Sequence, residues 1–156
     1  MITGPIECVL SDVDGVWTDN RLWFGGDAPL KVFDVRDGHG AVMLRKRGLP
    51  VAFVTGRNDL AMRQRAEELG VDWEFANRER PKGVIVRELL ARYGVDAART
   101  VFVGDDLTDL AAFAEVGWPV AVADAEVAVR RAARRVTRAR GGHGAFREVV
   151  RWILRD

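Results

Sequence analysis

The sequence has few of the features that tie a protein to an oxidising compartment or to a membrane. Its single cysteine, Cys8, has no partner for a disulfide within the chain, which favours a reducing cytosol. The N-terminal residues lack the basic flank and the apolar stretch of a signal peptide. No run of about 20 apolar residues is present, which argues against a membrane-spanning helix. We therefore expect a cytoplasmic protein that has no membrane partner.

A large excess of charge of one sign is also missing. The chain holds 24 Lys and Arg residues against 23 Asp and Glu residues, so its net charge is +1. This balance provides no global attraction for nucleic acid, and we expect no nucleic-acid partner. A basic run near the C-terminus is interpreted as the solvated face of a helix, made of Arg130, Arg131, Arg134, Arg135, Arg138 and Arg140.

The chain does contain a regular alternation of strand and helix patterns. Its 156 residues, 48% of them hydrophobic, fit one domain over residues 1–156. Apolar runs predict buried strands at residues 6–11, 51–54, 100–103 and 119–122. Helices are predicted at residues 40–48, 60–69 (capped by Asn58), 81–93, 109–116 and 125–134, and around an apolar stripe from Phe146 to Leu154. This alternation predicts an α/β fold, a doubly wound parallel sheet covered by helices on both faces.

A hairpin is predicted between the first strand and the first helix, at about residues 17–35. Two short apolar runs, at 21–24 and 30–33, flank Gly25-Gly26-Asp27. The neighbours Trp23 and Phe24 would face opposite sides of a strand. Because both are apolar, we expect both faces of the hairpin to be covered by association with another subunit.

Polar residues stand where three of the predicted strands end. Asp12 and Asp14 follow the first strand, Thr55 follows the second, and Asp105 and Asp106 follow the third. In a doubly wound parallel sheet, ligands bind beyond the carboxyl ends of the strands. We therefore expect these side chains to converge at one edge of the sheet.

The converging residue types favour phosphoryl transfer. Carboxylates at one crevice would repel one another unless a cation lies between them, and Mg²⁺ prefers oxygen ligands of this kind. Lys82 would add a second positive charge. Thr55 and the backbone amides around Gly15 and Gly56 could hold phosphate oxygens. Together these residues describe the parts of a phosphoryl-transfer site, which are a metal, a carboxylate nucleophile and a cationic clamp on the phosphate.

The same residues resemble the four motifs of the haloacid dehalogenase superfamily. Asp12-Val-Asp14-Gly15-Val16 is similar to the first motif, and Thr55-Gly56-Arg57 is similar to the second. Lys82 resembles the third motif, and Gly104-Asp105-Asp106-Leu-Thr-Asp109 resembles the fourth. Order and spacing agree, and the resemblance covers nearly the whole chain.

Three segments resemble one branch of that superfamily more closely. Residues 12–19, 33–40 and 140–148 are similar to 3-deoxy-D-manno-octulosonate 8-phosphate phosphatases. The same pattern occurs in nonulosonate 9-phosphate phosphatases and in a domain fused to some sialic-acid cytidylyltransferases. The resemblance implies a Rossmann-like fold in which a hairpin flap replaces the cap domain. It also implies a homotetramer whose neighbouring subunits help to close the active site.

The resemblance further implies a role for each motif residue. Asp12 would attack phosphorus to form an aspartyl phosphate, and Asp14 would act as general acid and then as general base. Mg²⁺ would be held by Asp12, the backbone carbonyl of Asp14, and Asp105. Asp106 and Asp109 would lie next to these ligands without contacting the metal, and Asp109 would orient Lys82. Thr55 and Lys82 would hold the phosphoryl group, and the substrate would contact Gly15, Gly56, Arg57, Arg36 and Asp37.

Three residues depart from the family pattern. Trp17 and His143 stand where a smaller aliphatic residue and an arginine are expected, and His39 stands where an aromatic or apolar residue is common. We place all three at the entrance of the site, where they bear on the sugar more than on the reaction. Cys8 lies within a predicted strand and is interpreted as a buried hydrophobe, not a nucleophile.

Three alternatives stand beside this interpretation. A signalling receiver domain shares the fold and an acidic site, but its phosphoacceptor lies on a later strand than the first. A non-catalytic oligomerisation module would not need the complete set of motif residues. A phosphatase for a different sugar phosphate is the strongest rival. We expect a Mg²⁺-dependent phosphomonoester hydrolase for 3-deoxy-octulosonate 8-phosphate or a nonulosonate 9-phosphate.

Overall fold

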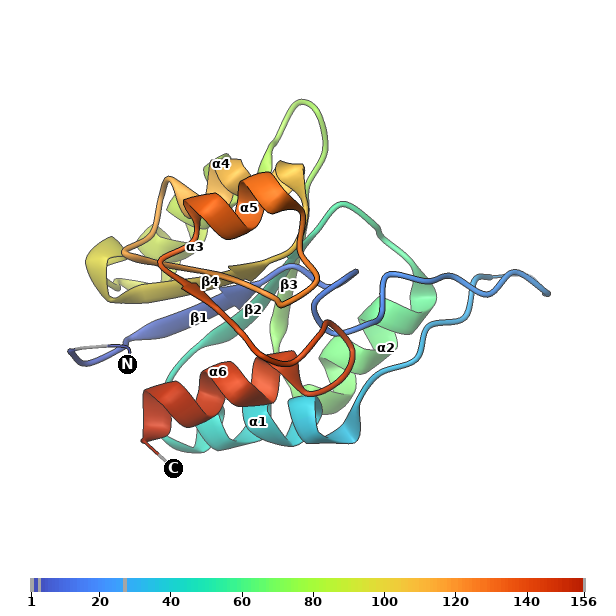
Figure 1. Ribbon diagram of the computed structural model, residues 1–156, viewed down its shortest axis with the longest axis horizontal. Coiled ribbons are helices and arrows are strands. Elements are labelled where there is room, and N and C mark those ends of the chain that lie inside the picture. The colour runs from blue at the N-terminus through green and yellow to red at the C-terminus, as the bar shows by residue number, and fades with distance from the viewer. Residues whose placement is uncertain (1, 3, 27, 156) are drawn as a thin grey trace.

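Six parallel strands form one central sheet in the computed structural model, which describes residues 2, 4–26 and 28–155. The strand order is β3-β2-β1-β4-β5-β6. The strands are β1 (Cys8–Ser11), β2 (Val51–Thr55), β3 (Asp72–Phe75), β4 (Thr100–Gly104), β5 (Trp118–Ala121) and β6 (Arg135–Val136). The order reverses direction at β1, which lies between β2 and β4 (Figure 1). The predicted doubly wound parallel sheet is therefore confirmed.

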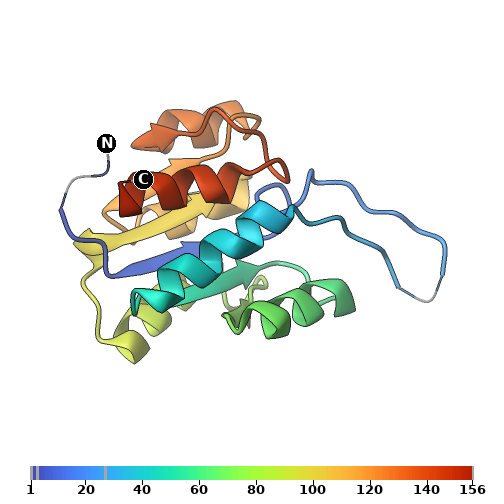
Figure 2. The same ribbon diagram turned by 90° about the horizontal axis from the view of Figure 1, so that it is seen from below.

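Helices cover both faces of the sheet. In Figure 1, α1, α2 and α6 lie below the sheet, and α3, α4 and α5 lie above it. Figure 2 shows α1 and α6 running side by side across the lower face. The helices are α1 (Val35–Lys46), α2 (Leu60–Leu69), α3 (Lys82–Tyr93), α4 (Leu110–Phe113), α5 (Val127–Ala132) and α6 (Ala145–Leu154), with single 3₁₀ turns η1 (Ala97–Arg99) and η2 (Leu107–Asp109).

The largest buried side chains pack against the central strands. Trp17 is fully buried between Phe53 and Phe146, with ring centroids 4.9 and 4.3 Å away. Its indole N–H donates to Ser11 Oγ at 3.0 Å, so its one polar atom is satisfied. The placement of Trp17 at the entrance was wrong. Trp17 is a core residue that packs the loop after β1 against α6.

Several element boundaries differ from the sequence prediction. Helix α1 begins at Val35 instead of after Gly40, because Asp34 caps it by accepting from the Arg36 N–H. Helix α2 is capped by Asp59 and not by Asn58. The helix predicted at 109–116 is a 3₁₀ turn followed by α4, and α5 is shorter than the predicted 125–134. Strands β3 and β6 were missed, since β3 is polar and only half-buried and β6 has two residues.

Residues 20–26 and 28–34, here called the arm, extend away from the body of the protein (Figure 2). The predicted strands at 21–24 and 30–33 are absent. Among the described residues of the arm, only Trp23 and Leu30 pair, exchanging backbone hydrogen bonds of 3.2 and 2.9 Å. Asp27, part of the predicted turn, lies outside the described residues. A lone two-stranded ribbon is marginal in water, which accounts for the short pairing. Trp23 is 65% exposed and Phe24 80%.

The basic run does not form one helix face. Only Arg130 and Arg131 lie in α5, where both are exposed. Arg134 lies over the ring of Trp118 at 4.2 Å, and Arg135 lies over Trp152 at 4.0 Å. These two cations cover apolar rings, so this part of the basic run has a structural role that needs no anionic partner. Within the described chain, none of the helices has the length and apolar character needed to span a bilayer.

Candidate active site

The carboxyl ends of β1, β2 and β4 meet at one edge of the sheet and border a cavity of about 460 Å³. Asp12 follows β1, Thr55 ends β2, and Asp105 follows β4. The parallel register brings these ends together although the residues are far apart in sequence. The cavity is lined by Asp12, Asp14, Asn20, Gly56, Arg57, Lys82, Asp105, Asp106 and Thr108.

Asp12 lies at the bottom of this cavity. Its backbone N–H donates to Val103 O at 2.9 Å, which continues the sheet pairing by one residue. Its Oδ1 accepts from the Val13 N–H at 2.7 Å, and its Oδ2 lies 2.6 Å from Lys82 Nζ. Burial, reinforced by the negative charge of Asp109, raises the pKa of Asp12, while Lys82 opposes that rise. The side chain is thus a buried, oriented carboxyl group with a cation beside it.

Lys82 enters the site from the first residue of α3 and is only 5% exposed. It donates to Asp109 Oδ1 at 2.7 Å as well as pairing with Asp12. Burial disfavours the ammonium, but Asp12 and Asp109 outweigh this effect and raise the pKa of Lys82. Lys82 therefore stays charged, and Asp109 holds it against the Asp12 carboxylate.

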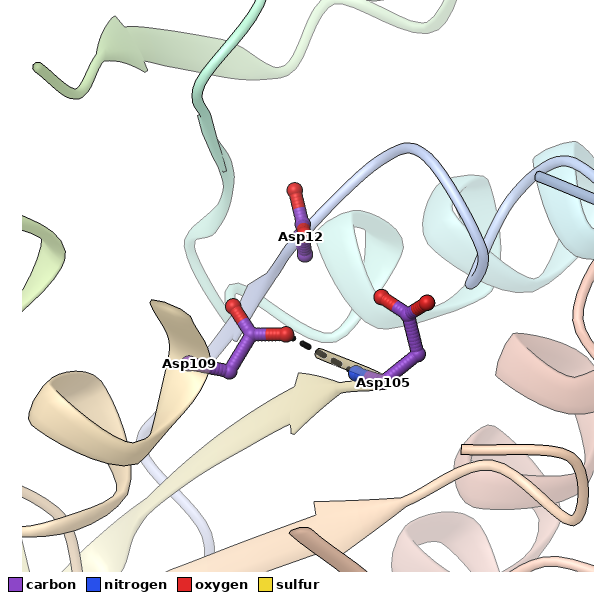
Figure 3. Close-up of side chains that lie close together, drawn as sticks. All are labelled: Asp12, Asp105 and Asp109. Carbon is purple, nitrogen blue, oxygen red and sulfur yellow. Dashed lines mark hydrogen bonds between the residues drawn. The ribbon is translucent and has the colours of Figure 1, made fainter. Parts of the chain in front are cut away.

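Three carboxylates, those of Asp12, Asp105 and Asp109, offer oxygens within 4.8 Å of one another (Figure 3). Both oxygens of Asp109 are already engaged. Oδ1 accepts from Lys82, and Oδ2 accepts from the backbone N–H groups of Asp105 and Asp106 at 2.8 and 3.1 Å. Asp109 therefore anchors both Lys82 and the loop after β4.

Asp105 is in the opposite situation. Its Oδ1 is buried and has no hydrogen-bond partner among the described residues, while Oδ2 accepts from Asn20 Nδ2 at 3.4 Å. Burial, together with the charge of Asp12, raises the pKa of Asp105 to about 8. A buried carboxylate oxygen without a donor, beside a second carboxylate, fits a hard divalent cation with oxygen ligands. The carboxylates of Asp12 and Asp105 therefore lie where such a cation could be held.

Gly15 is required by this close packing. Its φ is +82°, and a Cβ at this position would lie 1.9 Å from Asp105 Oδ2. Its N–H donates to Thr18 Oγ1 at 3.3 Å. Thr55 is fully buried, and its hydroxyl accepts from the Arg57 N–H at 3.1 Å. It thereby shapes the turn through which Gly56 and Arg57 reach the cavity wall.

Asp14 lies at the cavity mouth, where its side chain is 16% exposed. Arg57 Nε is 3.7 Å from Asp14 Oδ2. Lys31, which the sequence interpretation did not include, reaches in from the arm and lies 2.8 Å from Asp14 Oδ1. Asn20 and Thr108 were also missed as lining residues. A lone charge in the apolar run at residues 30–33 was the available signal for Lys31.

Two predicted substrate contacts do not line the cavity. Arg36 pairs with Asp34, the residue that caps its own helix, at 2.6 Å. Asp37 is fully buried and accepts from the backbone N–H groups of Gly144 and Arg147 at 3.3 and 2.7 Å. Asp37 therefore caps the N-terminus of α6, and burial raises its pKa to about 6. His39 and His143 are exposed and lie outside the cavity lining.

The comparisons with known proteins agree with this geometry. A family profile described as haloacid dehalogenase-like hydrolase matches residues 34–117. The 3-deoxy-D-manno-octulosonate 8-phosphate phosphatase of Haemophilus influenzae is 41% identical over 151 residues, covering 96% of this chain and 83% of that protein. The same enzyme of Escherichia coli K12 is 35% identical over 150 residues, covering 96% and 79%.

A solved structure shows the same fold with ligands bound. The 3-deoxy-D-manno-octulosonate 8-phosphate phosphatase of Moraxella catarrhalis, in complex with magnesium, phosphate and KDO, is 31% identical and superposes with a TM-score of 0.90. The match covers 96% of this chain and 86% of that structure. Among such hydrolases, the chain resembles the 3-deoxy-D-manno-octulosonate 8-phosphate phosphatases. It therefore belongs to the haloacid dehalogenase-like hydrolase family.

Proposed function

We propose that the protein is a Mg²⁺-dependent phosphatase that forms an aspartyl phosphate on Asp12 and acts on 3-deoxy-octulosonate 8-phosphate or a nonulosonate 9-phosphate. The observation that carries the proposal is that the carboxylates differ in their hydrogen-bond partners. Asp109 is fully engaged by protein donors, whereas Asp105 keeps a buried oxygen without one. Asp105 thus has an oxygen available for a cation beside the carboxylate of Asp12, and Lys82 supplies a fixed positive charge.

The chemistry follows from where the groups lie. A carboxylate oxygen of Asp12 attacks phosphorus while the bond from phosphorus to the sugar oxygen breaks. Asp14, at the cavity mouth, gives a proton to the departing sugar oxygen and then takes one from the water that attacks the aspartyl phosphate. In that second step the bond from phosphorus to the Asp12 oxygen breaks, which frees the Asp12 carboxylate and releases phosphate. The ammonium of Lys82, 2.6 Å from Asp12, stabilises the negative charge of the transferring group. Mg²⁺, when bound, neutralises charge between the carboxylates and the phosphate.

The character of the cavity supports a polar substrate, and a cation held between its carboxylates would offset their charge toward a phosphate. Its lining contains charged, amide, hydroxyl and backbone groups and no large apolar side chain. Arg57 is 58% exposed at the mouth and can reach a carboxylate on the sugar. The relatives are named for an eight-carbon sugar acid phosphate, which has both of the required anionic groups.

A further part of the proposal is that the protein works in the cytoplasm and assembles into a homotetramer, and the arm supports the assembly. Five large apolar side chains on or beside the arm are exposed, which a partner subunit would cover: Trp23, Phe24, Leu30, Val32 and Val35. Light scattering at working concentration tests this point. A monomer would remove the proposed role of the arm in assembly.

The function is tested by phosphate release from a panel of sugar phosphates, with Mg²⁺ and with chelator. Asp12→Asn removes the nucleophile, and Asp72→Asn serves as a matched control because Asp72 is exposed on β3, away from the cavity. We expect Mg²⁺-dependent release from octulosonate or nonulosonate phosphates, lost only in Asp12→Asn. Release from other sugar phosphates alone would retain the reaction and refute the substrate. No release from any of them would refute the reaction.

A further inference from the structure

One lysine of the arm points into the protein while its neighbours point outward. Leu30 and Val32 are 65% and 67% exposed, but the side chain of Lys31 is fully buried. Its Nζ lies 2.8 Å from Asp14 Oδ1, donates to Asp14 Oδ2 at 2.9 Å and pairs with Asp59 Oδ2 at 2.5 Å. The base of the arm is thus joined to two carboxylates of the body by one ammonium group.

The two carboxylates are held very differently. Asp59 is the cap of α2, and its Oδ1 accepts from the Met62 N–H at 2.9 Å. Asp59 is therefore a rigid attachment point. The Asp14 side chain accepts a hydrogen bond only from Lys31 among the described residues, and Arg57 is more distant at 3.7 Å. The orientation of the Asp14 carboxylate consequently depends on Lys31.

Burying a lysine is costly unless its charge is paired. Here the pairing is double, which explains how an ammonium group can be excluded from water at the edge of the site. An apolar residue at position 31 would leave Asp14 and Asp59 with a buried, unbalanced repulsion. The contact therefore stabilises the arm base in its observed position, beside the carboxylate that handles the proton.

We propose that Lys31 is a positioning residue that fastens the arm to α2 and thereby holds the Asp14 carboxylate in place for proton transfer. The catalytic half of this inference rests on the proposed phosphatase function. A general acid acts only within hydrogen-bond reach of the leaving oxygen, so loss of its orientation reduces proton transfer more than phosphate binding.

The catalytic half is tested by comparing leaving groups in Lys31→Met, which keeps the length and removes the charge. Lys46→Met, at an exposed position of α1, is the matched control. An alkyl phosphate needs a proton on its leaving oxygen, whereas p-nitrophenyl phosphate does not. We expect kcat on the sugar phosphate to fall by about tenfold or more, part of the roughly 10²–10⁴-fold that acid–base catalysis supplies. The burst of nitrophenolate should stay within about twofold of native.

Equal losses with both esters, or no loss with either, would overturn the assignment. Asp59→Asn provides a second variant, because asparagine still caps α2 while the charge that anchors Lys31 is gone. We expect it to show the same pattern to a smaller degree. If Lys31→Met fails to fold, Asp59→Asn decides the question by the same comparison.

The fastening half is tested without activity, by hydrogen exchange of the full protein. Amides at residues 28–34 should exchange faster in Lys31→Met and Asp59→Asn than in native protein or Lys46→Met. Unchanged exchange would overturn the fastening role. If native protein hydrolyses neither ester, the proposed function fails, and exchange alone decides whether Lys31 holds the arm.

Discussion

Replacing Asp105 by asparagine should stabilise the metal-free protein and abolish its stabilisation by Mg²⁺. Burial, with the charge of Asp12, raises the pKa of Asp105 from 3.8 to about 8. A carboxyl group whose pKa is higher in the folded state takes up a proton on folding. Its contribution is neutral below the unfolded pKa and becomes destabilising as the pH rises through the window from 3.8 to about 8.

The magnitude follows from the width of that window. Each pH unit above 3.8 contributes about 1.4 kcal/mol, so at pH 7 the native protein loses up to about 4 kcal/mol of unfolding free energy to this one group. Water entry and movement of Asn20 reduce this loss of unfolding free energy. We expect Asp105→Asn to gain at least about 1 kcal/mol, which corresponds to a rise in Tm of roughly 2–4 °C for a domain of this size.

The assay is thermal unfolding of native and Asp105→Asn protein between pH 5 and pH 8, with chelator and with Mg²⁺. In chelator, the native Tm should fall as the pH rises, and the fall should be smaller in the variant. Adding Mg²⁺ should raise the Tm of the native protein only, because the variant has a neutral amide in place of the charged carboxylate ligand. The reasoning is refuted if Asp105→Asn melts below native in chelator at pH 8, or if Mg²⁺ stabilises both proteins equally.

Three further substitutions test the surrounding architecture. Gly15→Ala should cost about 1–3 kcal/mol of stability and weaken Mg²⁺ binding, because φ is +82° and the new Cβ would clash with Asp105; unchanged unfolding and Mg²⁺ titrations would contradict this. Asp109→Asn should lower kcat by about 10–100-fold at unchanged fold by circular dichroism, since Lys82 loses its charged anchor; native kcat would count against that role. Asp37→Ala should destabilise the protein by about 1–3 kcal/mol in urea unfolding while leaving kcat intact, because it uncaps α6; a selective loss of substrate affinity would instead restore Asp37 as a substrate contact.

Much of the fold was predictable because its signals are local. The strands β1, β2 and β4 are mostly apolar runs with a polar residue at or just after their ends, and glycines follow α2 and α3 in the left-handed conformation. Strand β3 was missed because its four residues include Asp72 and Glu74, which satisfy their charges through contacts made only in the folded protein. Charged residues in a strand carry no local apolar signal.

Assignments at the margin of the site depended on packing and were less predictable. Asp37 lies in a segment that resembles the family pattern, yet its carboxylate faces the N-terminus of α6, more than 100 residues later in the chain. Trp17 follows the first motif closely but turns into the core against Phe146. In both cases the partner is distant in sequence, so no local pattern indicates which way the side chain turns.

The sequence by itself determined that parallel strands would end in carboxylates at one edge of a sheet, because apolar runs and the residues that follow them are local features. Only the tertiary structure decided what each carboxylate does there. Asp109 is engaged by Lys82 and two backbone N–H groups, Asp105 keeps a buried oxygen without a donor, and Lys31 is buried against Asp14. These differences arise from distances between side chains on separate elements, and distance sets both the desolvation and the pairing of a charge.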